Sequence, residues 1–123
     1  MIADAKERDY AVVVCGREEI GVYNHSMIYE DVFVKGLKVT NIDVHKSIEP
    51  MLDKPVLQLT PFFSTEDEEL IMPAMKHCIS ARWNPLFTDI TLQGADKGSA
   101  LLKMAAYIGI DPSECIAFGD GGN

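Results

Sequence analysis

Residues 115–123 read CIAFGDGGN, and this stretch decides which fold the sequence predicts. Its first four residues are apolar and are bounded by turn formers, a pattern that predicts a short buried strand. The strand would end at Gly119 and place the carboxylate of Asp120 at its tip. In open parallel α/β sheets, ligands bind beyond the carboxyl ends of the strands. We therefore expect Asp120 to lie where a protein of this class does its chemistry.

The residues before this strand would position a cation beside Asp120. An amphipathic helix is expected at residues 99–108, and Gly109 would end it. Residues 111–114 predict a single helical turn. A crossover helix runs back across a sheet before the next strand returns. Lys97, at the start of the helix, can therefore lie at the same edge of a parallel sheet as Asp120.

A bound phosphoryl group would give this pair of residues a function. Lys97 can neutralise phosphate oxygens as a point charge. Asp120 can hold Mg²⁺, an ion that favours one or two carboxylates together with waters and substrate phosphate. The same residues also fit a plain surface turn beside a solvated lysine. Spacing alone leaves both interpretations open.

The wider pattern favours the phosphate interpretation. Residues 94–98, the leucine-rich helix and the sequence IAFGDGGN resemble the C-terminal signature of the haloacid dehalogenase (HAD) superfamily, and more narrowly that of the Cof-type, or subfamily IIB, phosphatases. The resemblance implies a Mg²⁺-dependent phosphatase that hydrolyses a small phosphorylated metabolite, with a sugar phosphate expected, through an aspartyl-phosphate intermediate. It implies that Lys97 is catalytic and binds phosphate, that Asp120 binds the metal, and that Asn123 lies near the phosphate.

Two parts of that family's pattern are missing from the sequence. The family's nucleophile lies in an Asp-x-Asp motif, and no such motif occurs in these 123 residues. The second aspartate of the last motif would follow Asn123. In addition, a first helix without a cap and a final strand without its crossover helix predict a piece of a longer protein. We therefore expect this polypeptide alone to be inactive, although its parent is a phosphatase.

Residues 1–93 predict a different kind of structure, an α+β domain with an antiparallel-rich sheet and helices on one face. In element order, this part resembles the C2B-type cap of the same subfamily. The expected fold class is therefore α/β, with the cap at residues 1–93 and a partial Rossmann-like core at residues 94–123. Because the tail would lack parallel neighbours, we expect it to be disordered, packed differently or paired with another copy.

Local patterns divide the cap into elements. Residues 37–44 are expected to be irregular or a short strand, a capping box is expected at residues 65–68, and Pro73 should kink the helix that follows. Helices are expected at residues 1–9, 26–36, 45–52 and 65–75, and strands at residues 10–15, 20–23, 56–59, 78–83 and 87–93. Residues 32–34 could equally begin a strand.

Arg82 and Trp83 are the candidate substrate-binding residues of the cap. An arginine can form a forked contact with oxyanions, and a tryptophan can stack on the face of a sugar. The alternative is a core tryptophan beside an arginine that snorkels to the surface, and this alternative is the favoured one.

Composition restricts the possible partners. Lys and Arg total 11 against 19 Asp and Glu, a formal charge of −8, which argues against nucleic acid or an anionic membrane as the main partner. The apolar runs are shorter than a membrane span, so a cytoplasmic protein is expected. The three cysteines and three histidines show no metal-ligand or disulfide spacing, and the cysteines are expected to be buried thiols.

Two other classes remain for comparison. The motif Gly-Asp-Gly-x-Asn also resembles the phosphorylation domain of P-type ion pumps, but those need membrane spans and a long nucleotide domain, which this sequence lacks. The second class is a non-enzymatic α+β module that binds a ligand or serves a structural role.

Overall fold

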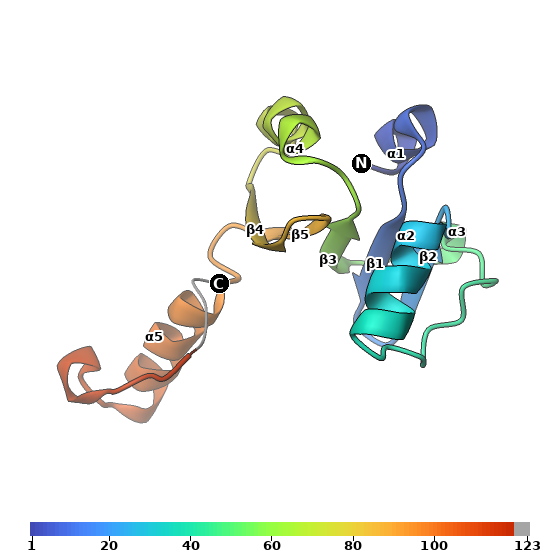
Figure 1. Ribbon diagram of the computed structural model, residues 1–123. Helices are drawn as coiled ribbons and strands as arrows, with labels where there is room; N and C mark the ends of the chain where they lie inside the picture. Colours follow the sequence, from blue (N-terminus) through green and yellow to red (C-terminus); the bar gives the residue numbers. More distant parts are fainter. Residues whose placement is uncertain (120–123) are drawn as a thin grey trace.

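The centre of the molecule is a five-stranded sheet in the order β2-β1-β3-β5-β4. Every neighbouring pair of strands is antiparallel. The structure is a computed structural model that describes residues 1–119 (Figure 1). Its strands are β1 (Val12–Gly16), β2 (Ile20–Tyr23), β3 (Val56–Pro61), β4 (Cys78–Asn84) and β5 (Phe87–Leu92).

Both predicted hairpins are confirmed. Strands β1 and β2 pair around the turn at residues 17–19, and β4 and β5 pair around Pro85 and Leu86. Strand β3 joins the two hairpins by pairing with β1 on one side and β5 on the other. It runs two residues beyond its predicted end, to Pro61.

Helices occur close to the predicted positions, and most are short. The 26–36 segment begins as an α-helix capped by Ser26 and continues as a π-helix. The predicted helix at residues 45–52 is reduced to one turn around Pro50, and residues 37–44 are irregular. The helical elements are α1 (Ile2–Arg8), α2 (Met27–Tyr29), η1 (Glu30–Gly36), α3 (Glu49–Leu52), α4 (Thr65–Ile71), η2 (Met72–Ala74), α5 (Lys97–Ile108) and η3 (Pro112–Glu114).

The N-terminus of α4 begins one residue earlier than the capping box predicted. Ser64, rather than Thr65, is the N-cap, and its hydroxyl accepts a hydrogen bond from the Asp67 amide at 3.1 Å. The kink expected from Pro73 appears as the 3₁₀ turn η2, which ends the α-helical part at Ile71.

Helices pack on both faces of the sheet rather than on one. Successive side chains of a strand point to opposite faces, so Val12 and Val14 face one core while Val13 faces the other. The first core receives side chains from α1, α3 and α4, namely Ala5, Met51 and Ile71. The second is an aromatic cluster of Tyr29, Phe33, Phe62 and Phe87, which come from α2, η1, the residue after β3, and β5.

The strand predicted at residues 115–118 is absent. This segment has no regular secondary structure, and Ile116 and Phe118 are 83% and 95% exposed. The physical reason is that the sheet is antiparallel throughout and offers this segment no parallel strand as a neighbour. Cys115 is exposed as well, so the expectation of a buried thiol is wrong there, and Cys15 and Cys78 are half-buried.

Helix α5 is separate from both cores. It extends away from the sheet beyond β4 and β5 (Figure 1), and Ala105 is its one buried residue. The remaining apolar side chains of α5 and the segment after it are largely exposed: Leu101, Leu102, Met104, Tyr107, Ile108, Ile110, Ile116 and Phe118.

Candidate functional site

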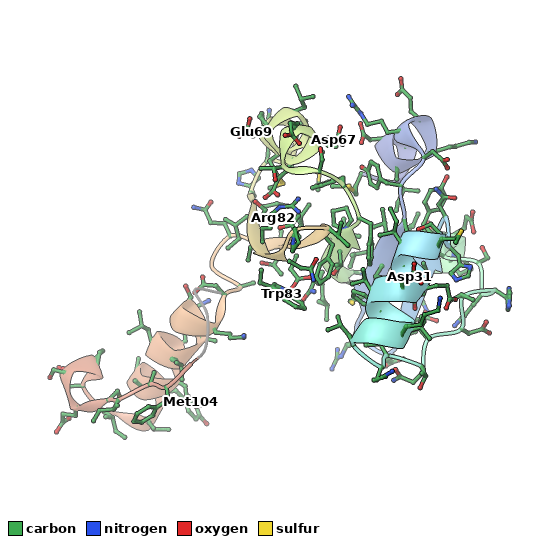
Figure 2. All side chains as sticks on the ribbon, viewed as in Figure 1. Asp31, Asp67, Glu69, Arg82, Trp83 and Met104 are labelled. Atoms are coloured by element: carbon green, nitrogen blue, oxygen red, sulfur yellow. The ribbon has the colours of Figure 1, made fainter. Side chains whose placement is uncertain are left out.

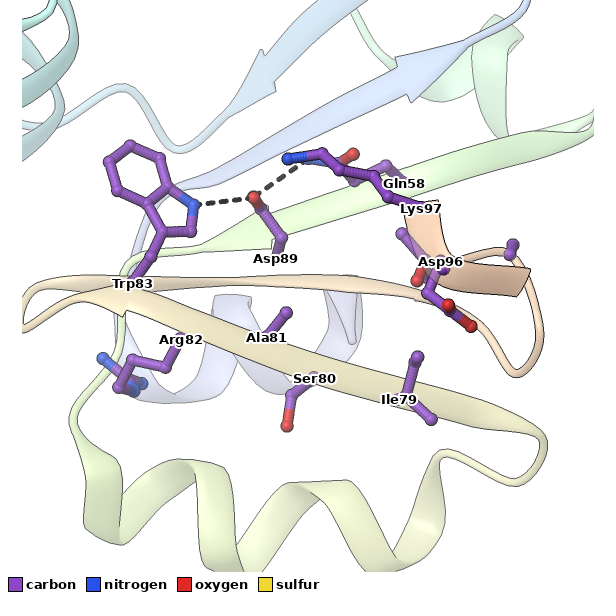
Figure 3. A pocket seen from close by; sticks show the side chains of 12 residues that line it. Gln58, Ile79, Ser80, Ala81, Arg82, Trp83, Asp89, Asp96 and Lys97 are labelled. Atoms are coloured by element: carbon purple, nitrogen blue, oxygen red, sulfur yellow. Dashed lines mark hydrogen bonds between the residues drawn. The ribbon is translucent and has the colours of Figure 1, made fainter. Parts of the chain in front are cut away.

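A cavity of about 870 Å³ lies between the sheet and the start of α5. Its walls come from β3, β4, β5 and the segment at residues 95–98 (Figure 3). None of the residues that line this cavity belongs to the aromatic cluster described above. The lining residues with polar side chains are Gln58, Ser80, Arg82, Trp83, Asp89, Thr91, Asp96 and Lys97.

Asp89 is held in the cavity wall by three hydrogen bonds from side chains. Its Oδ1 accepts hydrogen bonds from Gln58 Nε2 at 2.9 Å and Thr60 Oγ1 at 2.8 Å. Its Oδ2 accepts one from Trp83 Nε1 at 2.9 Å. The donors come from both neighbouring strands, β3 and β4, so the carboxylate is fixed by the sheet itself.

Strand register explains how these residues meet. Gln58 pairs with Thr91 and Leu59 with Ile90, and continuing this antiparallel register brings Thr60 opposite Asp89. On the other side, the partner of Asp89 is Ala81, whose methyl group leaves the carboxylate open to the cavity.

Arg82 and Trp83 are adjacent on β4, and their side chains point to opposite faces of the sheet (Figure 2). Trp83 lies on the same side as Asp89 and Gln58 (Figure 3) and is 50% exposed. Its ring makes an edge contact with Phe87, with 4.7 Å between the ring centroids. Trp83 is therefore a residue of the cavity wall and not of the core, contrary to the favoured alternative.

Arg82 points toward α4, and its donors are already engaged. Its Nε donates to Glu68 Oε2 at 2.6 Å. The other nitrogens donate to five backbone carbonyl oxygens, those of Phe63, Ser64, Asn84, Pro85 and Phe87. With a side chain only 18% exposed, Arg82 joins the β4–β5 turn to α4. This geometry weighs against the predicted contact of Arg82 with substrate and favours a structural role.

Lys97 lines the cavity, and the N-cap of α5 determines its position. Asp96 is the N-cap, and it accepts hydrogen bonds from the Ser99 amide and the Ser99 hydroxyl, each at 2.7 Å. These hydrogen bonds lower the pKa of Asp96, and the hydrogen bond from the Ser99 backbone amide is the larger cause. The cap fixes where α5 begins and therefore places Lys97 at the first helical position, beside the sheet.

Asp120 and Asn123 lie outside the described residues. Within residues 1–119, no group of three or more His, Cys, Asp or Glu side chains could hold a metal ion.

Comparison with known families decides the family. The family model of haloacid dehalogenase-like hydrolases matches residues 1–123. The chain belongs to this family.

Solved structures of HAD proteins refine this assignment. A sugar phosphatase of HAD subclass IIB is 27% identical, covers 90% of this chain and has a TM-score of 0.81. A phosphatase of the haloalkanoate (HAD) superfamily from Bacteroides thetaiotaomicron is 32% identical, covers 99% of the chain and has a TM-score of 0.83. This chain covers 42% and 45% of those two chains, so it spans less than half of the HAD relatives it matches. The resemblance to subclass IIB and the mixed α/β fold class are confirmed.

The sequence prediction missed two lining residues of this HAD chain's cavity, Asp89 and Gln58. It also missed Thr60, a buried residue that donates a hydrogen bond to Asp89. The available signal was the spacing of polar residues by two along β3 and β5, at positions 58 and 60 and at positions 89 and 91. Such spacing places polar side chains on one face of a sheet.

The described residues of the chain contain no helix that is long and apolar enough to cross a membrane.

Proposed function

We propose that this chain supplies the cap and the lysine-bearing helix of a Mg²⁺-dependent phosphatase that hydrolyses a small phosphorylated metabolite, in particular a sugar phosphate. The observation that carries the proposal is that Lys97 lines one cavity together with Gln58, Trp83 and Asp89 of the sheet. The family match and the relatives named as a sugar phosphatase and a phosphatase support it.

In this proposal, residues 1–93 form the C2B-type cap and residues 94–123 belong to a Rossmann-like core. The exposed apolar residues of α5 support this division, because a helix of this kind needs a partner to bury it. The matched structures are more than twice as long as this chain, and the remainder of such a core would cover this helix.

The residues of the chain would share the work as follows. Lys97 would neutralise the phosphate oxygens and steady the nucleophile, whereas the cap sheet would hold the rest of the substrate. Asp120 would bind the metal ion, and Asn123 would lie near the phosphate. When bound, Mg²⁺ would neutralise developing charge on the phosphate.

The chemistry proposed for the whole protein is a two-step transfer through an aspartyl-phosphate. A carboxylate attacks phosphorus, the sugar hydroxyl leaves, and water then hydrolyses the acyl phosphate. The sequence has no Asp-x-Asp motif to supply this nucleophile. We therefore propose that the 123-residue chain alone releases no phosphate and that another segment must provide the nucleophile.

The test is phosphate release from glucose 1-phosphate by protein expressed from the complete reading frame, with Mg²⁺ and with a chelator, beside the 123-residue chain. The proposal expects activity that requires Mg²⁺ from the first and none from the second. A non-enzymatic α+β module is the alternative. It would release no phosphate in any form and would show no Mg²⁺-dependent heat on calorimetric titration with a phosphate mimic.

A further inference from the structure

The carboxylate of Asp89 has one acceptor position that no donor among residues 1–119 occupies. A carboxylate oxygen offers two lone-pair positions. The donors Gln58 and Thr60 occupy both positions of Oδ1, whereas Trp83 occupies one position of Oδ2. One acceptor position of Oδ2 therefore stays available beside the indole, at the wall of the cavity.

The three donors also fix the direction of that acceptor. Thr60 is 2% exposed and sits at the sheet pairing between β3 and β5, so its hydroxyl cannot swing away without disturbing the core. The indole of Trp83 is held at both ends, through its N–H by Asp89 and through its ring by Phe87. A ligand that enters the cavity would meet a preformed pair of groups, a half-exposed aromatic surface and a fixed anionic acceptor.

Charge then determines which ligands this pair accepts. Asp89 carries a negative charge and can accept only from O–H or N–H donors, so it repels a carboxylate or a second phosphate. Arg82, the cation nearest to Trp83 in sequence, is on the opposite face and bonded to Glu68. The ring face of a sugar can stack on the indole of Trp83, and the hydroxyl groups of the sugar can donate hydrogen bonds to Asp89.

We propose that Asp89 and Trp83 form the subsite for the non-phosphorylated end of the substrate, and that this subsite selects an uncharged sugar ring bearing hydroxyl groups over an acidic one. This inference rests on the proposed function, because the phosphate of the same ligand is assigned to Lys97, which lines the same cavity. The cavity of about 870 Å³ falls within the range of roughly 300–1,000 Å³ that is usual for small-molecule sites.

The test uses the fluorescence of Trp83, the one tryptophan of the 123-residue chain. The chain is titrated with glucose 1-phosphate and with glucuronic acid 1-phosphate, which differ only at C6, where a carboxylate replaces the hydroxymethyl group. Asp89→Asn is the test variant, and Asp53→Asn, an equal change of charge at an exposed site outside the cavity, is the matched control. Thermal unfolding checks that each variant is folded.

The inference expects a saturable change of Trp83 emission with glucose 1-phosphate and at least about tenfold weaker binding of the glucuronic acid compound. In Asp89→Asn, binding of glucose 1-phosphate should weaken by about tenfold, as when a hydrogen bond to a charged group is lost, and the preference should largely disappear. Asp53→Asn should bind like the wild type. Three results would contradict the proposed subsite. They are the absence of a saturable change in emission, equal affinity for the two ligands, and an Asp89→Asn variant that binds glucose 1-phosphate as tightly as the wild type.

The comparison of two ligands on the wild-type chain needs no variant, so it decides the matter even if Asp89→Asn does not fold. Failure of the proposed function is visible separately. A complete protein that releases no phosphate while Trp83 still reports selective sugar binding would reject the phosphatase and keep the subsite. An active phosphatase with no selectivity at Trp83 would reject the subsite alone.

Discussion

The guanidinium of Arg82 donates a hydrogen bond of 2.6 Å from Nε to Glu68 Oε2, joining β4 to α4 across 14 residues of sequence. Both side chains are less than one-fifth exposed. The remaining nitrogens of Arg82 satisfy carbonyl oxygens on both sides of the β4–β5 turn, together with those that precede α4. One side chain therefore holds the hairpin that carries Trp83 and Asp89 against the helical layer.

Replacing this arginine should be costly because a largely buried carboxylate would lose its partner. We expect Arg82→Ala to lower the free energy of unfolding by about 3 kcal/mol, as measured by urea denaturation. Arg82→Lys should recover only part of the loss, because an ammonium group cannot reproduce the planar fork. Lys35→Ala, which removes an exposed i,i+4 pair with Asp31, is the control and should change little. An Arg82→Ala variant as stable as this control would show that the network is not structural.

Two buried threonines on adjacent strands allow a paired test of hydrogen bonding. The Thr88 hydroxyl is fully buried and has no partner among the described residues, whereas the Thr60 hydroxyl donates to Asp89 at 2.8 Å. We expect Thr88→Val to be neutral or stabilising by up to about 1 kcal/mol, and Thr60→Val to be destabilising by about 1–2 kcal/mol. Thermal unfolding of the two variants checks this. The same sign and size of change for both would contradict the assignment.

The ion cluster around Glu19 predicts a dependence of stability on pH. Hydrogen bonds from Lys46 and, at 2.8 Å, from Lys54 lower the pKa of Glu19 from 4.5 to about 2. Because the pKa is lower in the folded state, the stabilisation is fully present above about pH 4.5 and is lost as the pH falls toward 2.

The measurement is the difference in melting temperature between the wild type and Glu19→Gln across this range of pH. The difference should be largest above pH 4.5 and should shrink toward pH 2. It should also decrease in concentrated salt, because these side chains lie at the surface where ions screen them. A difference that grows as the pH falls would have the wrong sign for this account.

Most of the sheet could be predicted from the sequence because its signals are local. Alternation of apolar residues and turn formers locates both hairpins, and Gly109 and residues 111–114 locate the end of α5 and the turn after it. The strand expected at residues 115–118 failed because its stability depends on parallel neighbours, which no local pattern supplies. The helices cover both faces of the sheet because η1 brings Phe33 onto the second face, a long-range contact.

In the candidate site too, residues marked by local sequence patterns could be predicted, whereas those that depend on long-range contacts could not. Lys97 could be recognised from a motif and lines the cavity, whereas Asp120 and Asn123 lie outside the described residues. Arg82 and Trp83 were considered together because they are adjacent, yet the alternation of a strand sends them to opposite faces. Asp89 was not recognised as a site residue, because its importance comes from donors on β3 and β4 that the sequence separates by as many as 31 residues.

The most direct test of the central proposal concerns Lys97. Phosphate release from glucose 1-phosphate is measured with protein from the complete reading frame, carrying Lys97→Ala or, as the control on the same helix, Lys103→Ala. The account predicts that Lys97→Ala loses at least about a hundredfold in kcat/KM, the scale expected when a charge that stabilises the transition state is removed, while Lys103→Ala keeps wild-type activity. Equal activity of the two variants would contradict it.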